Sequence, residues 1–225
     1  HGTHIMTYDF SFVLSYWDVL LKGLLVTIAF TSLAGLVGAL CGFGMCLARV
    51  SGNAGVRWFA AAYVNLFRGT PLLIQLFWIY FCLPVLVGTD LPPYVCVFVS
   101  LVLYTTAITS ETFRGAIKSI PPEQHDACVA LNLPWSSKII FVIFPQTLLR
   151  ATPSLLSNMV SLFKESALIS SVGVADLMFA GQSLSNATAR PVEFLTTVAV
   201  IYFVVAFPLT HFASRLEKRY LARMA

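Results

Sequence analysis

The sequence predicts an all-α integral membrane protein with about five transmembrane helices. Of its 225 residues, 58% are hydrophobic and 11% are charged, and the mean hydropathy is +0.82. A soluble domain carries roughly 25% charged residues, so this composition indicates a membrane protein. The apolar runs near 17–48, 58–87, 94–117, 137–163 and 193–214 are each long enough to cross a bilayer. We therefore expect one transmembrane domain over 7–225.

The N-terminal region divides into a short polar start and a long apolar run. The opening HGTHIM, residues 1–6, resembles a cloning remnant and carries no functional argument. The run at 17–48 is much longer than the apolar part of a signal peptide, so we expect it to remain in the mature protein. Within it Ala34, Gly38 and Gly42 recur every four residues and leave one helical face nearly bare. This face predicts close packing against a helix of the same chain or of a partner.

The second run contains a breaker, FRGTPLLIQLF, at Arg68, Gly69 and Pro71. Proline removes a backbone donor and forces a kink or an end, so the residues before it are expected to form a short interfacial helix. We interpret Arg68 as an anchor that extends to the cytoplasmic interface, and the alternative is a functional charge.

The third and fourth runs carry polar side chains at helical spacing. Glu111 and Arg114 lie three residues apart, where opposite charges pair on a helix. An acid within a span needs such a partner or a polar cavity, so structural pairing and substrate contact both remain open. In the fourth run Thr147, Ser154, Asn158, Ser161 and Glu165 follow at spacings of seven, four, three and four, which places them on one helical face. This face predicts either hydrogen bonds between helices or the wall of a solute path.

The basic residues set the expected orientation. By the positive-inside rule the side with more lysine and arginine faces the cytoplasm, which places the N-terminus outside and the C-terminus inside. The other side holds Lys22, Lys164 and Arg190. The cytoplasmic side holds Arg49, Arg57, Arg114, Lys118, Lys138, Arg215, Lys218, Arg219 and Arg223. Because these residues lie at span ends without interleaved aromatics, nucleic-acid binding is excluded.

Several classes of site are missing from the sequence. It has no HExxH, no GxSxG, no clustered metal-ligand spacing and no GxxxxGK[ST] loop, so any energy from ATP must enter through another subunit. Its five cysteines form no CxxC pair and are interpreted as small hydrophobic residues. Pairing of Cys82 with Cys96, which flank a short loop, is left open.

The stretch SIPPEQHDACVALNLP at 119–134 predicts a short ordered helix on the cytoplasmic side. Pro121 and Pro122 suit a first helical turn, and Glu123 and Asp126 lie near its positive end. Asn132 is suited to the left-handed position after the last turn. A small cytoplasmic face seldom needs such a helix, so we interpret it as a docking element; the alternative is a solvated connector.

These residues also carry a family resemblance. The segment SETFRGAIKSIPPEQHDACVALNLPWSSKIIFVIFPQTLLRATPSLLSNMVSLFKESAL resembles the cytoplasmic loop and following span of permease subunits of bacterial polar amino acid ABC importers, the histidine/glutamine/glutamate permease-like family. FRGTP, VADL at 174–177 and LEKR at 216–219 are similar to the same family, so the resemblance runs from about residue 8 onward.

The loop departs from the family pattern while keeping its spacing. The family has Glu-Ala-Ala, a glycine four residues later and Ile-x-Leu-Pro ten residues after that. Here these positions read Asp126-Ala127-Cys128, Asn132 and VIFP ending at Pro145. Aspartate is a shorter acid, cysteine is small and asparagine tolerates a left-handed turn, so we expect an intact loop with altered coupling strength at most.

The resemblance implies a type I ABC importer permease-like fold that moves a polar amino acid into the cytoplasm by alternating access. It also implies a second permease chain, identical or similar, an extracytoplasmic binding protein, and two copies of a cytoplasmic ATP-binding subunit that uses ATP and Mg²⁺; this chain binds no cofactor. The expected membrane is the bacterial inner membrane. The expected coupling residues are Glu123, Asp126, Ala127, Cys128, Leu131, Asn132 and Pro145. The expected path residues are Glu111, Ser154, Asn158, Ser161 and Glu165.

One alternative function comes from another class. An ATPase-independent secondary transporter or channel would use Glu111 and Glu165 as ion-coupling acids. The identity of the amino acid is left open among glutamine, glutamate and the basic amino acids.

Overall fold

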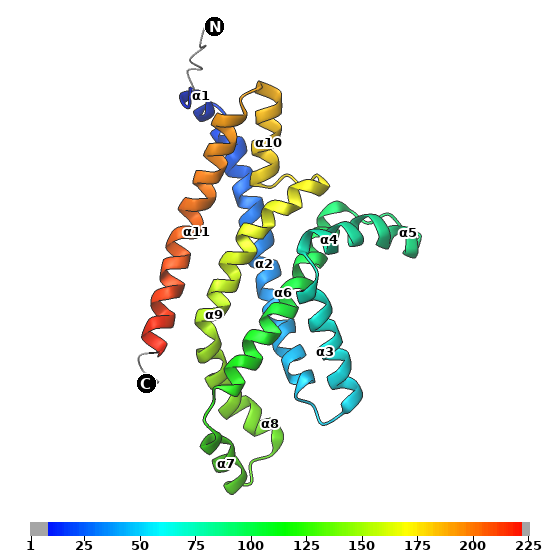
Figure 1. Ribbon diagram of the computed structural model, residues 1–225, viewed down its shortest axis with the longest axis vertical. Coiled ribbons are helices and arrows are strands. Elements are labelled where there is room, and N and C mark those ends of the chain that lie inside the picture. Colours follow the sequence, from blue (N-terminus) through cyan, green and yellow to red (C-terminus); the bar gives the residue numbers. More distant parts are fainter. Residues whose placement is uncertain (1–8, 222–225) are drawn as a thin grey trace.

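The computed structural model describes residues 9–221, and the regular structure within this range is helical. The predicted cloning remnant at 1–6 lies outside the described residues. Figure 1 shows the long helices side by side, with α1 and α10 at one end and α7 and α8 at the other. The elements are α1 (Ser11–Leu14), α2 (Trp17–Arg49), α3 (Ala54–Gly69), α4 (Leu72–Phe77), η1 (Trp78–Cys82), α5 (Leu83–Val87), α6 (Pro93–Lys118), α7 (Pro122–Ala130), α8 (Trp135–Ser137), η2 (Lys138–Ile143), α9 (Phe144–Glu165), η3 (Ser166–Val172), α10 (Leu177–Thr188) and α11 (Pro191–Leu221).

The predicted five spans are confirmed, with one change of shape. Four described segments are long and apolar enough to cross a membrane: Trp17–Arg49, Pro93–Lys118, Trp135–Val172 and Pro191–Leu216. The fifth is the pair Ala54–Gly69 and Leu72–Val87, which is bent by 106° at the break between its two helices. The second run is therefore a broken span.

The bend follows from Pro71 and is stabilised by Gln75. Thr70 and Pro71 are extended, so the helical hydrogen-bond ladder stops at the end of α3. Carbonyl groups at a helix end need donors, most of all where lipid excludes water. Gln75 is buried and its Nε2 donates to the carbonyl oxygens of Phe67 at 2.7 Å and of Thr70 at 2.9 Å. One side chain of α4 thus caps α3.

The bare face of α2 packs against α6 of the same chain, which answers the question left open by the sequence. Gly38 and Gly42 are buried, and Thr109 Oγ1 of α6 donates to the Gly38 carbonyl at 3.0 Å. A Cβ built on Gly42 would lie 2.0 Å from Thr109 Oγ1, and one on Gly38 would lie 2.6 Å from Thr105 Cβ. Side chains of any size are therefore excluded at both glycines.

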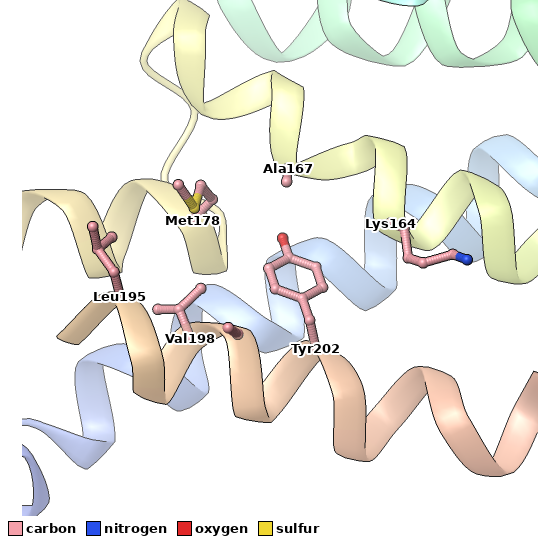
Figure 2. A pocket seen from close by; sticks show the side chains of 7 residues that line it. Lys164, Ala167, Met178, Leu195, Val198 and Tyr202 are labelled. Atoms are coloured by element: carbon pink, nitrogen blue, oxygen red, sulfur yellow. The ribbon is translucent and has the colours of Figure 1, made fainter. Parts of the chain in front are cut away.

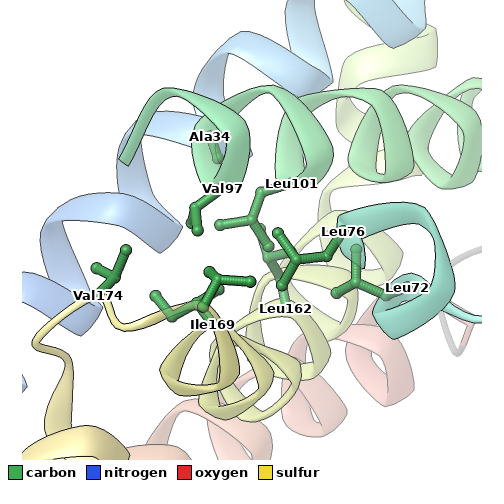
Figure 3. Close-up of a cluster of buried hydrophobic side chains, with 9 residues drawn as sticks. Ala34, Leu72, Leu76, Val97, Leu101, Leu162, Ile169 and Val174 are labelled. Carbon is green, nitrogen blue, oxygen red and sulfur yellow. The ribbon is translucent and has the colours of Figure 1, made fainter. Parts of the chain in front are cut away.

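A buried apolar cluster joins the bend to the long helices (Figure 3). It brings α4 against α6 and against the end of the fourth span, so it fixes α6 beside α9. Its buried members are Ala34, Leu72, Leu76, Val97, Leu101, Leu162, Ile169, Val172 and Val174. Between helices in a bilayer the alternative to burial is contact with lipid, so this cluster stabilises the fold mainly through close packing.

At the end of the molecule that carries α10, Asp176 is the N-cap residue of α10. Its Oδ1 accepts from the Phe179 N–H at 2.8 Å, and Thr27 Oγ1 of α2 accepts from the Leu177 N–H at 3.1 Å. Asp176 is fully buried, and this burial raises the pKa of its carboxyl to about 6. The loop between η3 and α10 is thereby fixed to α2.

The five cysteines are free thiols, so Cys82 and Cys96 do not pair. Cys46, Cys96 and Cys128 are buried, as expected for small hydrophobic residues. Cys41 and Cys82 are exposed on the surface of the single chain, which corrects that expectation for these two positions.

Candidate translocation path and coupling loop

The predicted loop helix forms as α7, with Pro121 as its cap and Pro122 in its first turn. Asn132 has a φ of 47°, so the predicted left-handed position is confirmed. The Leu133 N–H donates to the Cys128 carbonyl at 3.0 Å and the Asn132 N–H to the Val129 carbonyl at 2.9 Å. This pair of bonds is a Schellman motif, which satisfies the last carbonyls and turns the chain toward Pro134.

Two side chains near the start of α9 form hydrogen bonds with the loop. Arg150 Nη1 donates to the Ser119 carbonyl at 2.7 Å, and Gln146 Nε2 donates to Gln124 Oε1 at 3.2 Å. Cys128, one of the predicted coupling residues, is buried on the inner side of α7. The sequence analysis missed Arg150 and Gln146, although their spacing of four residues places both on one side of α9. Gln146 therefore links α9 to α7, and Arg150 links α9 to the end of α6 just before the loop.

The outer side of the loop exposes apolar side chains. Val129 is 72% exposed, Leu131 71% and Trp135 66%. The predicted coupling residues Glu123, Asp126, Ala127 and Pro145 are also exposed. The outer side of the loop thus combines three exposed apolar side chains with two exposed acids, Glu123 and Asp126.

Glu111 of α6 lies at the centre of three arginines. Arg114 Nη2 lies 2.5 Å from its Oε2, so the predicted pair forms. Arg49, at the end of α2, also contacts the Glu111 carboxylate, and Arg68 Nη1 lies 3.7 Å from Oε2. The interpretation of Arg68 as an interfacial anchor is incomplete, because its guanidinium turns toward Glu111. Gly69 and Pro71 act as predicted and place Arg68 at the bend.

The predicted polar face of α9 contains residues that bond to α6, residues that are exposed, and one residue that is buried. Asn158 Nδ2 donates to Thr112 Oγ1 of α6 at 2.8 Å, and Glu165 Oε1 accepts from Tyr104 OH of α6 at 3.0 Å. These two residues join the helices, as the structural alternative predicts. Ser154 and Ser161 remain exposed in the single chain, whereas Thr147 is fully buried. Of the two exposed serines, Ser161 lies between the joined residues Asn158 and Glu165, and Ser154 lies one turn before Asn158.

A cavity of about 350 Å³ lies away from this polar face, between the fourth span, α10 and α11 (Figure 2). Its lining is mainly apolar and includes Ala167, Met178, Leu195 and Val198, with Lys164 and Tyr202 beside them. It lacks convergent polar groups, so we assign no solute contact to it. Among the described residues no group of His, Cys, Asp or Glu is arranged to hold a metal ion.

A bent second span, an ordered loop helix and a polar face between α6 and α9 are the features that the comparisons with known proteins must account for. Residues 34–222 match the family model described as "binding-protein-dependent transport system inner membrane component". This match covers most of the chain, which belongs to that family.

The individual relatives are permease proteins of amino acid transport systems. The chain is 30% identical to the arginine transport system permease protein ArtQ of Bacillus subtilis (strain 168), over 95% of this chain and 98% of the relative. It is 32% identical to the putative glutamine transport system permease protein GlnP of Rickettsia felis, over 93% and 98%. It is 29% identical to the glutamate/aspartate import permease protein GltK of Escherichia coli O6:H1, over 94% and 98%. The chain is therefore an ABC transporter permease of the polar amino acid family.

Solved structures agree with this placement. A crystal structure of an amino acid ABC transporter with histidines has a TM-score of 0.87 and 30% identity, covering 95% of this chain and 100% of that one. An inward-facing structure of the MetNI methionine ABC transporter has a TM-score of 0.76 at 21% identity, covering 89% and 95%, and supports the fold alone.

Proposed function

We propose that this permease carries a polar amino acid into the cytoplasm by alternating access, driven by ATP hydrolysis in two copies of a cytoplasmic partner that uses ATP and Mg²⁺. A second permease chain, identical or similar, completes the path, and an extracytoplasmic binding protein delivers the amino acid. The N-terminus lies outside and the C-terminus in the cytoplasm. The family placement and the relatives that handle arginine, glutamine and glutamate support this proposal.

The observation that carries the proposal is the exposed apolar side of α7. Val129 and Leu131 are exposed on a loop that α9 contacts at two points, through Gln146 to Gln124 of α7 and through Arg150 to Ser119 at the end of α6. A partner that binds this side and moves on nucleotide binding therefore shifts α9 directly. Such a shift changes the populations of inward-facing and outward-facing bundles without any ATP site in this chain.

Co-purification of the permease with its ATP-binding subunit tests the docking surface. Ala127 is exposed on α7, so Ala127→Trp should abolish co-purification and ATP-dependent uptake in proteoliposomes. Ala187→Trp is the matched control, because Ala187 is exposed on α10 at the opposite end of the molecule. Retention of the ATPase by Ala127→Trp would contradict the docking assignment, and absence of any ATP-dependent uptake by the wild type would overturn the function.

The polar face of α9 is proposed as one wall of the path, with Ser154, Asn158, Ser161 and Glu165 on it. Asn158→Leu should lower transport-coupled ATPase activity while the complex still assembles. Thr112→Val removes the partner of Asn158 without touching the wall itself, so it separates the two roles. An equal loss in both variants would assign Asn158 to helix packing.

The alternative of an ATPase-independent transporter is disfavoured by the state of its two acids. Glu111 is held by three arginines and Glu165 accepts a hydrogen bond from Tyr104. A coupling acid must bind and release an ion during each cycle, and the Glu111 carboxylate is already occupied by ion pairs with the arginines.

A further inference from the structure

The arginines around Glu111 form a group that the proposed function does not use. We infer that Arg68, supported by Arg114, binds the α-carboxylate of the departing amino acid at the cytoplasmic side of the path. This inference rests on the proposed function and adds a contact on the exit side, away from the polar face of α9.

The arginines around Glu111 outnumber the carboxylates that they pair with. Guanidinium groups from α2, α3 and α6 converge on one carboxylate, and among residues 9–221 their ion pairs all go to Glu111. The group therefore carries a surplus of two positive charges. Cations that are partly removed from water repel one another and need an anion to balance them. A second oxyanion is the missing component.

Glu111 binds the three arginines unequally. Arg114 meets Glu111 through Nε at 3.1 Å and Nη2 at 2.5 Å, and the Arg49 side chain is 16% exposed. Arg68 lies at 3.7 Å, beyond hydrogen-bond distance, and its side chain is 48% exposed. The planar fork of Arg68 therefore remains available for two parallel bonds to a carboxylate.

Glu111 and Arg68 lie farther along the proposed path than Glu165. Tyr104, which bonds Glu165, and Glu111 are seven residues apart on α6, which is about 10.5 Å along a helix and nearly two full turns. They therefore lie on the same side of α6. Glu111 is the one nearer Lys118, where α6 runs into the coupling loop. A solute that leaves the level of Glu165 toward the cytoplasm next meets Arg68.

The two flanks of α3 separate this site from lipid. Arg68 belongs to a flank with Arg57, Ala61 and Asn65, at spacings of four, four and three. The other flank, with Leu66 and Thr70, lines an apolar groove of about 540 Å³ together with residues of α4, η1 and α6. The apolar groove suits acyl chains, whereas the flank with Arg68 carries polar side chains that suit a solute carboxylate.

Every amino acid carries the same α-carboxylate, so this contact would bind different amino acids regardless of their side chains. Glu111 competes for the same guanidinium groups. The competition keeps the bound state weak enough for release, and it predicts that loss of the Glu111 charge strengthens binding.

Labelling of Arg68 by phenylglyoxal, quantified by mass spectrometry, tests the site in the permease–ATPase complex in nanodiscs of phosphatidylcholine. We expect millimolar L-arginine and L-glutamine each to slow labelling of Arg68, whereas L-argininamide and L-glutaminamide do not. Arg215, exposed on α11, serves as the internal control and should label equally in all samples. In Glu111→Gln the concentration that half-protects Arg68 should fall about tenfold, the effect of one charge-assisted bond.

Equal protection by acids and amides, or no protection, would overturn the inference. Protection only after addition of phosphatidylglycerol would assign the site to a lipid phosphate and also overturn it. If Glu111→Gln does not assemble, the labelling of the wild type still decides. ATP-dependent uptake that persists without any protection of Arg68 would refute this inference alone, whereas a complex without uptake would refute the proposed function.

Discussion

Replacement of Gly42 by alanine tests the packing of α2 on α6. The added Cβ would lie 2.0 Å from Thr109 Oγ1 and 3.0 Å from both Ser110 N and Thr106 O. Two of these three atoms belong to the α6 backbone and cannot rotate away, so the helices must separate. Separation also breaks the bond from Thr109 to the Gly38 carbonyl.

The magnitude follows from three opposing effects. Overpacking costs about 1–3 kcal/mol and the lost hydrogen bond about 1 kcal/mol, while alanine restores about 1 kcal/mol of helix propensity. We expect a net loss of about 2 kcal/mol, which lowers Tm by about 6 °C for a chain of this size.

The assay is thermal unfolding of the purified complex, with Gly44→Ala as the matched control. Gly44 lies on the same helix with nothing within 4 Å of a built Cβ, so this variant should unfold at or above the wild-type temperature. If Gly42→Ala unfolds together with Gly44→Ala, the close contact between α2 and α6 is refuted.

Three further predictions concern single side chains. Asn132→Val should destabilise the loop by about 1–2 kcal/mol because its φ is 47°, and Asn132→Gly should not; equal co-purification of the ATPase by both variants would contradict this. Burial raises the pKa of Asp176 to about 6 from its ordinary 3.8, so its contribution to stability is full below about pH 4. About 3 kcal/mol is lost as pH rises through 6. Asp176→Asn keeps a capping oxygen and should therefore unfold later than the wild type at pH 8 but not at pH 4; parallel pH profiles would exclude a raised pKa. Gln75→Leu removes the side-chain amide that donates to the carbonyls at the end of α3, so it should lower the stability measured by thermal unfolding by about 2 kcal/mol. Gln182→Leu, exposed on α10, is the control and should lower it little. Equal unfolding midpoints for the two variants would show that Gln75 does not stabilise the bend.

Features with a local cause could be predicted from the sequence. The bare face of Gly38 and Gly42 follows from helical spacing, the break at Pro71 from the missing N–H, and the left-handed Asn132 from its position before Pro134. Each depends on a few neighbouring residues, and the structure confirms each.

Features that depend on distant residues could not be predicted. Arg68 and Arg49 meet Glu111 only because α2, α3 and α6 are folded together, and no periodicity links the three positions. Gln75 is a single amide in an apolar run, so no pattern indicates that it caps α3. Likewise the spacing of Asn158 and Glu165 gives their common face but not Thr112 and Tyr104 opposite them.

The broken second span has a consequence for membrane insertion. Its first helix, α3, has 16 residues and is about 24 Å long, shorter than a hydrocarbon core of about 30 Å. The open backbone at Thr70 therefore lies at membrane depth, where lipid offers no hydrogen bonds. Gln75 of α4 supplies these hydrogen bonds from within the same span. The second span can therefore take its bent shape on its own, before the third span is synthesised and enters the bilayer.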